Sequence, residues 1–223
     1  MRIVNTSGVL KGLAYAMALV AVLGLNGCED EDSSSDGNAT LLPDRFRITV
    51  YYTPVESFHN GDLVAIQGET SIDGEGGQQS LGAYPASFIE AVRMEGVGRI
   101  TSGAYVGKYL NGSLGGGFWI SDFPPDAYGD SLKAFKTAAA DDDVMPRGTR
   151  FRLVEPFAQP GGWPVESAVV RRLRSTVWEV QDHFEAGYGG QFHLDLYVGE
   201  QDRYDFTSSP WYIALENAGV EVF

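Results

Sequence analysis

The chain has 223 residues, of which 16 are Lys or Arg and 30 are Asp or Glu, so its formal net charge at pH 7 is −14. A field of that sign repels phosphate backbones, and nucleic acid is therefore not an expected partner. Cys28 is the only cysteine, which excludes a disulfide bond within the chain.

The first 28 residues have the features of an export signal. Arg2 and Lys11 give a positively charged start, an apolar run follows from 13 to 25, and the sequence LNGC ending at Cys28 resembles a bacterial lipobox. The apolar run is shorter than the roughly 20 residues that a membrane-spanning helix needs, which favours cleavage. We expect Cys28 to be the lipidated first residue of a lipoprotein; the alternative is an ordinary signal peptide with an incidental cysteine.

Residues 29–40, EDEDSSSDGNAT, contain no large apolar side chain. Such a segment cannot bury enough surface to fold, so it is predicted to be a flexible acidic tether. Residues 41–223 are long enough for a single domain with a substantial core. We therefore expect a monomer that is lipid-anchored in the bacterial cell envelope and faces the periplasm, on the outer membrane in preference to the inner one.

The first half of the domain contains one clear strand and one clear helix. The alternating sequence RFRITVYY predicts a strand over Arg45 to Tyr52. Gly, Gln, Ser and acidic residues dominate 56–85, which predicts a long irregular loop of the kind that is functional or mobile in compact domains. Helical spacing of apolar residues predicts a short helix from Ser87 to Glu95. The glycine-rich stretch 110–117 lacks the lysine of a phosphate-binding loop and is predicted to be a turn.

The second half begins with a strand over Phe135 to Ala140, which runs into three aspartates and a Pro-Arg-Gly turn before a second strand over Thr149 to Val154. Residues 165–174 fit a helix or a strand equally well. After Ser209, a proline and then a glycine ten residues on predict a short helix. Val220 to Phe223 then form a last strand.

Trp178 to Glu200 is the stretch most informative about chemistry. Alternating residues predict two strands, one ending at Asp182 and one containing Asp195, with glycines at 187, 189 and 190 between them. Such glycines suit a tight connection or the close approach of a ligand. Asp is disfavoured within strands, so Asp195, with leucine on both sides, needs an explanation. Two remain open: a carboxylate that caps backbone amides, and a carboxylate that does chemistry.

These residues resemble the 3D domain, named for three aspartates, of the membrane-bound lytic transglycosylase A family. The resemblance covers roughly Arg45 to Phe223 and implies a mainly β fold, a six-stranded double-psi β-barrel with one or two short peripheral helices. Asp141, Asp182 and Asp195 match the three aspartates. The other matching segments are Tyr51 to Pro54, Thr101 to Gly103, Lys136 to Arg152 and the Asp-Leu-Tyr sequence at 195–197.

Two departures from the family pattern are visible. His183-Phe184-Glu185 follows Asp182 where the family has Thr-Gly-Gly. The segment between the first strand and Gly98 is expected to be too short for the second domain with which the full transglycosylases wall their groove.

The resemblance implies cleavage of peptidoglycan glycan strands between N-acetylmuramic acid and N-acetylglucosamine, with the sugar's own 6-hydroxyl as nucleophile and a 1,6-anhydro product. One carboxyl group then serves as general acid and as general base, and the resemblance assigns this role to Asp195. Asp182 is its expected neighbour, and Asp141 is expected to anchor the turn. No cofactor or metal is expected. The residues expected to contact substrate are Tyr197, Tyr188, Gly189, Gly190 and Tyr52.

Three alternatives remain. Aromatic residues in a barrel are more often core than sugar-binding. The rival to the enzyme is a non-catalytic peptidoglycan-binding or envelope-structural lipoprotein, because one barrel fold serves several functions. Convergence of Asp182 and Asp195 in an open cleft favours the enzyme. The third alternative is a metal site built on His183, His193 and the aspartates, but the histidines lack a recurring ligand pattern.

Overall fold

The computed structural model of the chain describes residues 39–70, 77–112, 116–184 and 189–223. These residues belong to one compact unit. The expected signal segment with Cys28, most of the tether and Tyr188 lie outside the described residues. No helix in the described part of the chain is both long enough and apolar enough to cross a membrane.

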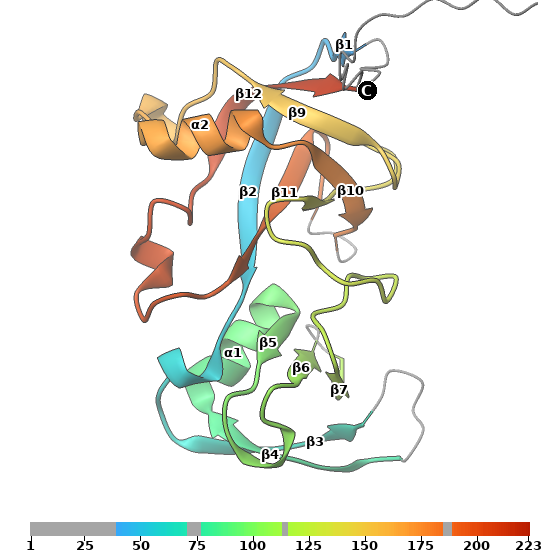
Figure 1. The fold of residues 1–223 in the computed structure, drawn as a ribbon, viewed down its shortest axis with the longest axis vertical. Coiled ribbons are helices and arrows are strands. Elements are labelled where there is room, and N and C mark those ends of the chain that lie inside the picture. Colours follow the sequence, from blue (N-terminus) through green and yellow to red (C-terminus); the bar gives the residue numbers. More distant parts are fainter. Residues whose placement is uncertain (1–38, 71–76, 113–115, 185–188) are drawn as a thin grey trace, which may run out of the picture. The chain divides into compact units, whose positions relative to one another are not determined.

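Six strands close into a barrel (Figure 1). In order around the barrel the strands are β12 (Leu215–Val222), β2 (Phe46–Thr53), β11 (His193–Glu200), β8 (Thr137–Ala139), β10 (Trp178–Asp182) and β9 (Arg150–Val154), which pairs again with β12. The β2–β11 and β8–β10 pairs are parallel, and the remaining pairs are antiparallel. A short strand, β1 (Thr40–Leu41), extends the sheet beyond β12. The predicted fold class, mainly β with a six-stranded barrel, is confirmed.

The barrel core follows from the alternation of apolar residues along these strands. Ile48 on β2 and Leu194 and Leu196 on β11 are buried together with Trp178. Each such side chain contributes roughly 1.5–3 kcal/mol by leaving water. Because successive strand residues face opposite ways, burying these residues turns Thr49 on β2 and Asp195 on β11 away from the core. The strands predicted around Asp182 and Asp195 are confirmed.

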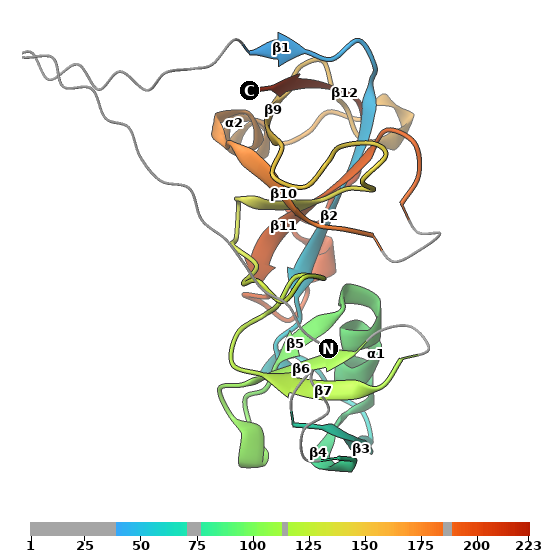
Figure 2. The same cartoon turned by 90° about the vertical axis from the view of Figure 1, so that its right-hand side faces the viewer.

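The segment that fitted helix or strand equally well forms α2 (Ser167–Ser175). The helix buries Val169 and Leu173 in the barrel core and lies against β9 (Figure 2). Its arginines face outward, so its apolar residues occupy one stripe, as expected of a surface helix.

A second sheet occupies the region that was predicted to be an irregular loop, and that prediction is wrong. The sheet has its own core, in which Leu81 and Leu110 pack against Phe88 and Val92 of the helix α1 (Ala86–Glu95). The strand order is β4 (Gln79–Pro85), β3 (Leu63–Glu69), β7 (Phe118–Ser121), β6 (Tyr109–Gly112) and β5 (Val97–Arg99). The helix contacts β5 and β6 (Figure 2).

The end of the chain also differs from its prediction. In place of a helix after Ser209, a 3-10 turn covers Phe206–Ser208 and β12 begins at Leu215. β12 pairs with β2 on one side and β9 on the other, so closing the barrel outweighs the local capping signals. A Cβ at Gly219 would lie 2.6 Å from Val154 Cγ2, so this glycine serves close strand packing rather than a helix end.

Candidate active site

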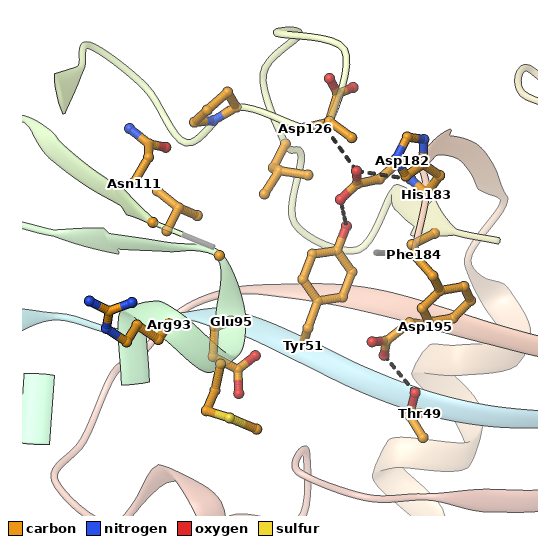
Figure 3. Close-up of a pocket in the computed structure, with 18 of the residues that line it drawn as sticks. Thr49, Tyr51, Arg93, Glu95, Asn111, Asp126, Asp182, His183, Phe184 and Asp195 are labelled. Atoms are coloured by element: carbon orange, nitrogen blue, oxygen red, sulfur yellow. Dashed lines mark hydrogen bonds between the residues drawn. The ribbon is translucent and has the colours of Figure 1, made fainter. Parts of the chain in front are cut away.

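A cavity of about 630 Å³ lies between side chains of the barrel and side chains of the second sheet (Figure 3). The barrel contributes residues of β2, β8, β10 and β11, and the other wall comes from the end of α1, from β5, β6 and β7, and from the loop after β7. The polar and aromatic residues of the barrel wall are Thr49, Tyr51, Asp182, His183, Phe184, His193 and Asp195; those of the opposite wall are Arg93, Glu95, Asn111, Trp119 and Asp126.

Asp195 is held by the strand beside it. β11 runs parallel to β2 with Asp195 opposite Thr49, and the Thr49 hydroxyl donates a hydrogen bond of 2.8 Å to Oδ1 of the Asp195 carboxylate. Burial raises the pKa of Asp195 to about 7; the charge of Asp182 adds to this, while Arg47 and the bonds from Thr49 and the Leu196 backbone oppose it. Near neutral pH both forms of Asp195 are therefore populated, as a group that donates and then accepts a proton requires.

Asp182 is fixed by three donors at the end of β10. Tyr51 donates to its Oδ2 at 3.0 Å, and the backbone N–H groups of Ala127 and His183 each donate to Oδ1 at 2.9 Å. Burial raises the pKa of Asp182, the three hydrogen bonds lower it, and Asp126 raises it again. Both oxygens are engaged, so Asp182 is a positioned carboxylate whose charge acts on Asp195.

Asp141 is not among the residues that line the cavity. Its Oδ2 accepts a hydrogen bond of 2.8 Å from the Gly190 backbone N–H. A Cβ atom at Gly189 would collide with the Asp141 carboxylate, so only glycine fits there. The structure thus places Asp141, Gly189 and Gly190 together, at the turn that leads into β11.

Two tyrosines expected to contact substrate are core residues. Tyr197 is 2% exposed, and its hydroxyl lies 2.6 Å from Thr53 Oγ1. Tyr52 is 5% exposed and packs against Phe206 at 4.5 Å between ring centroids. Neither ring is among the residues that line the cavity, and each packs within a small hydrophobic cluster.

Sequence reasoning missed Glu95, the last residue of α1. Its Oε2 accepts a 3.3 Å hydrogen bond from the Tyr52 backbone N–H, and its side chain lies in the cavity (Figure 3). Burial raises the pKa of Glu95 to about 8; the Tyr52 bond opposes this and the charge of Asp195 adds to it. An acid in the last turn of a helix is unfavourable to the helix dipole, and that was the available signal.

Sequence reasoning also missed the partners of the two aspartates, Thr49 and Tyr51. They lie two residues apart on β2, so they share a face. Across the ranges that the structure describes, no three His, Cys, Asp or Glu side chains are grouped as metal ligands.

No protein-family model and no curated protein sequence matches this chain. Among solved structures, the membrane-bound lytic murein transglycosylase of Agrobacterium tumefaciens matches with a TM-score of 0.52 at 10% identity, over 82% of this chain and 75% of that one. The shared feature is the fold. Escherichia coli MltA with bound chitohexaose matches with a TM-score of 0.48 at 18% identity, covering 79% and 70%. MltA from Neisseria gonorrhoeae also gives 0.48, at 14% identity, covering 79% and 72%.

Proposed function

We propose that this chain cleaves the glycan strands of peptidoglycan between N-acetylmuramic acid and N-acetylglucosamine, as a lytic transglycosylase with Asp195 as general acid and base. The observation that carries the proposal is the position of Asp195, held by Thr49 in a cavity and with a pKa raised to about 7. The fold shared with the lytic murein transglycosylase of Agrobacterium tumefaciens supports it.

In the first step, protonated Asp195 gives its proton to the glycosidic oxygen as the bond from that oxygen to C1 of the muramic acid breaks. Positive charge develops at C1 and the ring oxygen. Asp182 supplies a fixed negative charge in the same cavity, and its three hydrogen bonds keep it oriented before the charge appears.

In the second step, the 6-hydroxyl of the same sugar attacks C1. The Asp195 carboxylate accepts the hydroxyl proton, the oxygen bonds to C1, and a 1,6-anhydro end results. Asp195 is protonated again and no water is consumed. A single carboxyl group suffices because its pKa lies near the working pH.

The wall opposite Asp195 is expected to hold the glycan. Trp119 offers an aromatic face, and Arg93 and Asn111 offer hydrogen-bond donors and acceptors, all in the same cavity. Asn111 and Trp119 come from strands of the second sheet, and Arg93 comes from the helix α1 that packs on that sheet.

The rival proposal is a module that binds peptidoglycan without cutting it. The altered residues after Asp182, which place His183 and Phe184 in the cavity, favour it. Convergence of Asp182 and Asp195 in one cavity favours the enzyme. In either case we propose a monomeric lipoprotein anchored through Cys28 and facing the periplasm.

The test is digestion of purified sacculi by the chain from Glu29 onward. Wild type is compared with Asp195→Asn and with Asp143→Asn, a matched control because Asp143 is exposed and lies outside the cavity. We expect wild type and the control to release muropeptides with anhydro ends and Asp195→Asn to release none. If all three folded proteins co-sediment with sacculi and none releases muropeptides, the enzyme proposal is contradicted and the binding module is supported.

A further inference from the structure

The Thr49 hydroxyl joins two titratable groups. Its Oγ1 lies 2.8 Å from Oδ1 of Asp195 and 2.8 Å from Nε2 of His193. A hydroxyl has one hydrogen, so it donates to one of these neighbours at a time and accepts from the other. The direction of this hydrogen therefore links the protonation of Asp195 to the protonation of the His193 ring.

We propose that His193 is a positioning residue that acts on Asp195 through Thr49, by setting which way the Thr49 hydroxyl points. The proposal deepens the proposed function, and its use in catalysis rests on that function. The hydrogen-bond chain itself is independent of any substrate.

The neutral His193 ring has a preferred tautomer. A hydrogen bond with the Gly189 backbone raises the pKa of His193, although burial lowers it more. A partner that raises the pKa of a histidine accepts a ring N–H, and Nε2 already faces Thr49. In the proposed arrangement the ring proton lies on Nδ1, toward the Gly189 backbone, and Nε2 presents its lone pair to Thr49.

This tautomer favours the acid form of Asp195. Thr49 donates to Nε2, so its oxygen accepts from protonated Asp195, and all three groups are satisfied. When Asp195 loses its proton the hydroxyl must turn to the carboxylate, and His193 then lacks a donor unless its ring is protonated at Nε2. Competition between two acceptors for one hydrogen thus resists ionisation of Asp195.

The turn that holds the ring is itself anchored. Asp141 accepts from the Gly190 N–H, and the neighbouring Gly189 partners the His193 ring. On its open side the ring stacks on Phe184, with 4.7 Å between ring centroids. Asp141 therefore lies at one end of this chain of contacts and Asp195 at the other, and Asp141 acts through the turn.

Other charged groups face the pair from the surrounding elements and stay in place in the variants below. They add a constant background to both titrations. They are Arg47 on β2, Asp141 after β8, Asp182 on β10 and Glu95 on α1, with the hydroxyls of Tyr51 and Tyr212.

The test follows the carboxyl carbon of Asp195 by NMR as pH is varied, with Asp195→Asn assigning the resonance. His193→Phe keeps an aromatic ring to stack on Phe184 but removes the acceptor. The Thr49 hydrogen is then free for Asp195, and we expect the pKa of Asp195 to fall by about one pH unit. Thr49→Val removes the donor, and we expect the pKa to rise by about as much. Thr49→Ser restores the wild-type value.

The double variant separates positioning from packing. If His193 acts through Thr49, His193→Phe leaves the Asp195 pKa unchanged in the Thr49→Val background. An equal fall in both backgrounds would overturn the proposal, as would nitrogen NMR shifts that place the neutral ring proton on Nε2. Because the titration needs no substrate, an inactive protein with coupled titrations refutes the proposed function alone, and an active one without coupling refutes this inference alone.

Discussion

Tyr51 donates its hydroxyl hydrogen to Asp182 at 3.0 Å, two residues along β2 from Thr49, which holds Asp195 at 2.8 Å. One face of one strand therefore orients both carboxylates of the cavity. Since strand residues two apart are fixed by the backbone, the two acids have a spacing set by the barrel rather than by a loop.

Removal of the Tyr51 hydroxyl tests this arrangement. Tyr51→Phe takes one donor from Asp182, so the pKa of Asp182 rises further and its carboxylate is less firmly oriented. We expect glycan cleavage to slow roughly tenfold, about 1.4 kcal/mol of transition-state stabilisation. The matched control is Tyr109→Phe, which breaks a 2.7 Å hydrogen bond to Glu200 outside the cavity. Equal slowing by both variants would show a general structural effect.

The pH dependence of cleavage follows from Asp195. The acid step needs its protonated form, and burial places its pKa at about 7. We expect kcat/KM to fall about tenfold per pH unit well above that value. Rates of anhydro-muropeptide release between pH 5 and 9 measure this, and a rate that stays level to pH 9 contradicts the assignment of Asp195 as the acid.

Glu95 makes folding stability depend on pH in a predictable direction. Its folded pKa of about 8 lies above the ordinary value of 4.5, so between these values the folded state holds a proton that the unfolded state has lost. Stability is therefore full below about pH 4.5 and falls as pH rises to about 8, by up to roughly 1.4 kcal/mol per pH unit. The raised pKa of Asp195 also makes the folded state less stable as pH rises.

Urea unfolding at pH 5 and pH 8 measures this effect. Glu95→Gln removes a titrating group, so the loss of stability between the two pH values is expected to shrink. Glu90→Gln is the control, since Glu90 lies exposed on the same helix. A loss of stability that is the same in wild type and Glu95→Gln would show that Glu95 ionises freely in the folded protein.

The turn before β11 has a steric requirement. Gly189→Ala would drive its Cβ into the Asp141 carboxylate, and we expect the free energy of unfolding to fall by about 2 kcal/mol or more. Asp141→Ala should restore part of this loss, because it clears the space. Gly117→Ala, where no heavy atom lies within 4 Å of the added Cβ, serves as the control. Additive losses in the double variant would argue against the contact.

Sequence patterns predicted the parts of the site that depend on local alternation. The strands carrying Asp182 and Asp195 were found because their apolar residues repeat with period two. Thr49, the partner of Asp195, was not predicted. It lies 146 residues from Asp195 along the chain and contacts it only because β2 and β11 pair in parallel. Glu95 was missed for the same reason, because only tertiary packing buries it.

The larger errors have a shared physical cause. Local composition suggested a loop at 56–85 and a helix after Ser209, but pairing with distant strands decided both regions. In β4, Leu81 and Tyr84 are buried in the core of the second sheet although their neighbours along the chain are polar. In β12, Leu215 and Val220 are buried in the barrel. Long-range burial outweighed weak local preference in each case.

The most direct test of the central claim is the fate of solvent oxygen during cleavage. Sacculi are digested in water enriched in oxygen-18, and the new muramic acid ends are weighed by mass spectrometry for wild type, Asp195→Asn and Asp143→Asn. The account predicts anhydro ends without label from wild type and Asp143→Asn, and no new ends from Asp195→Asn. Labelled reducing ends, or anhydro ends that persist in Asp195→Asn, would contradict it.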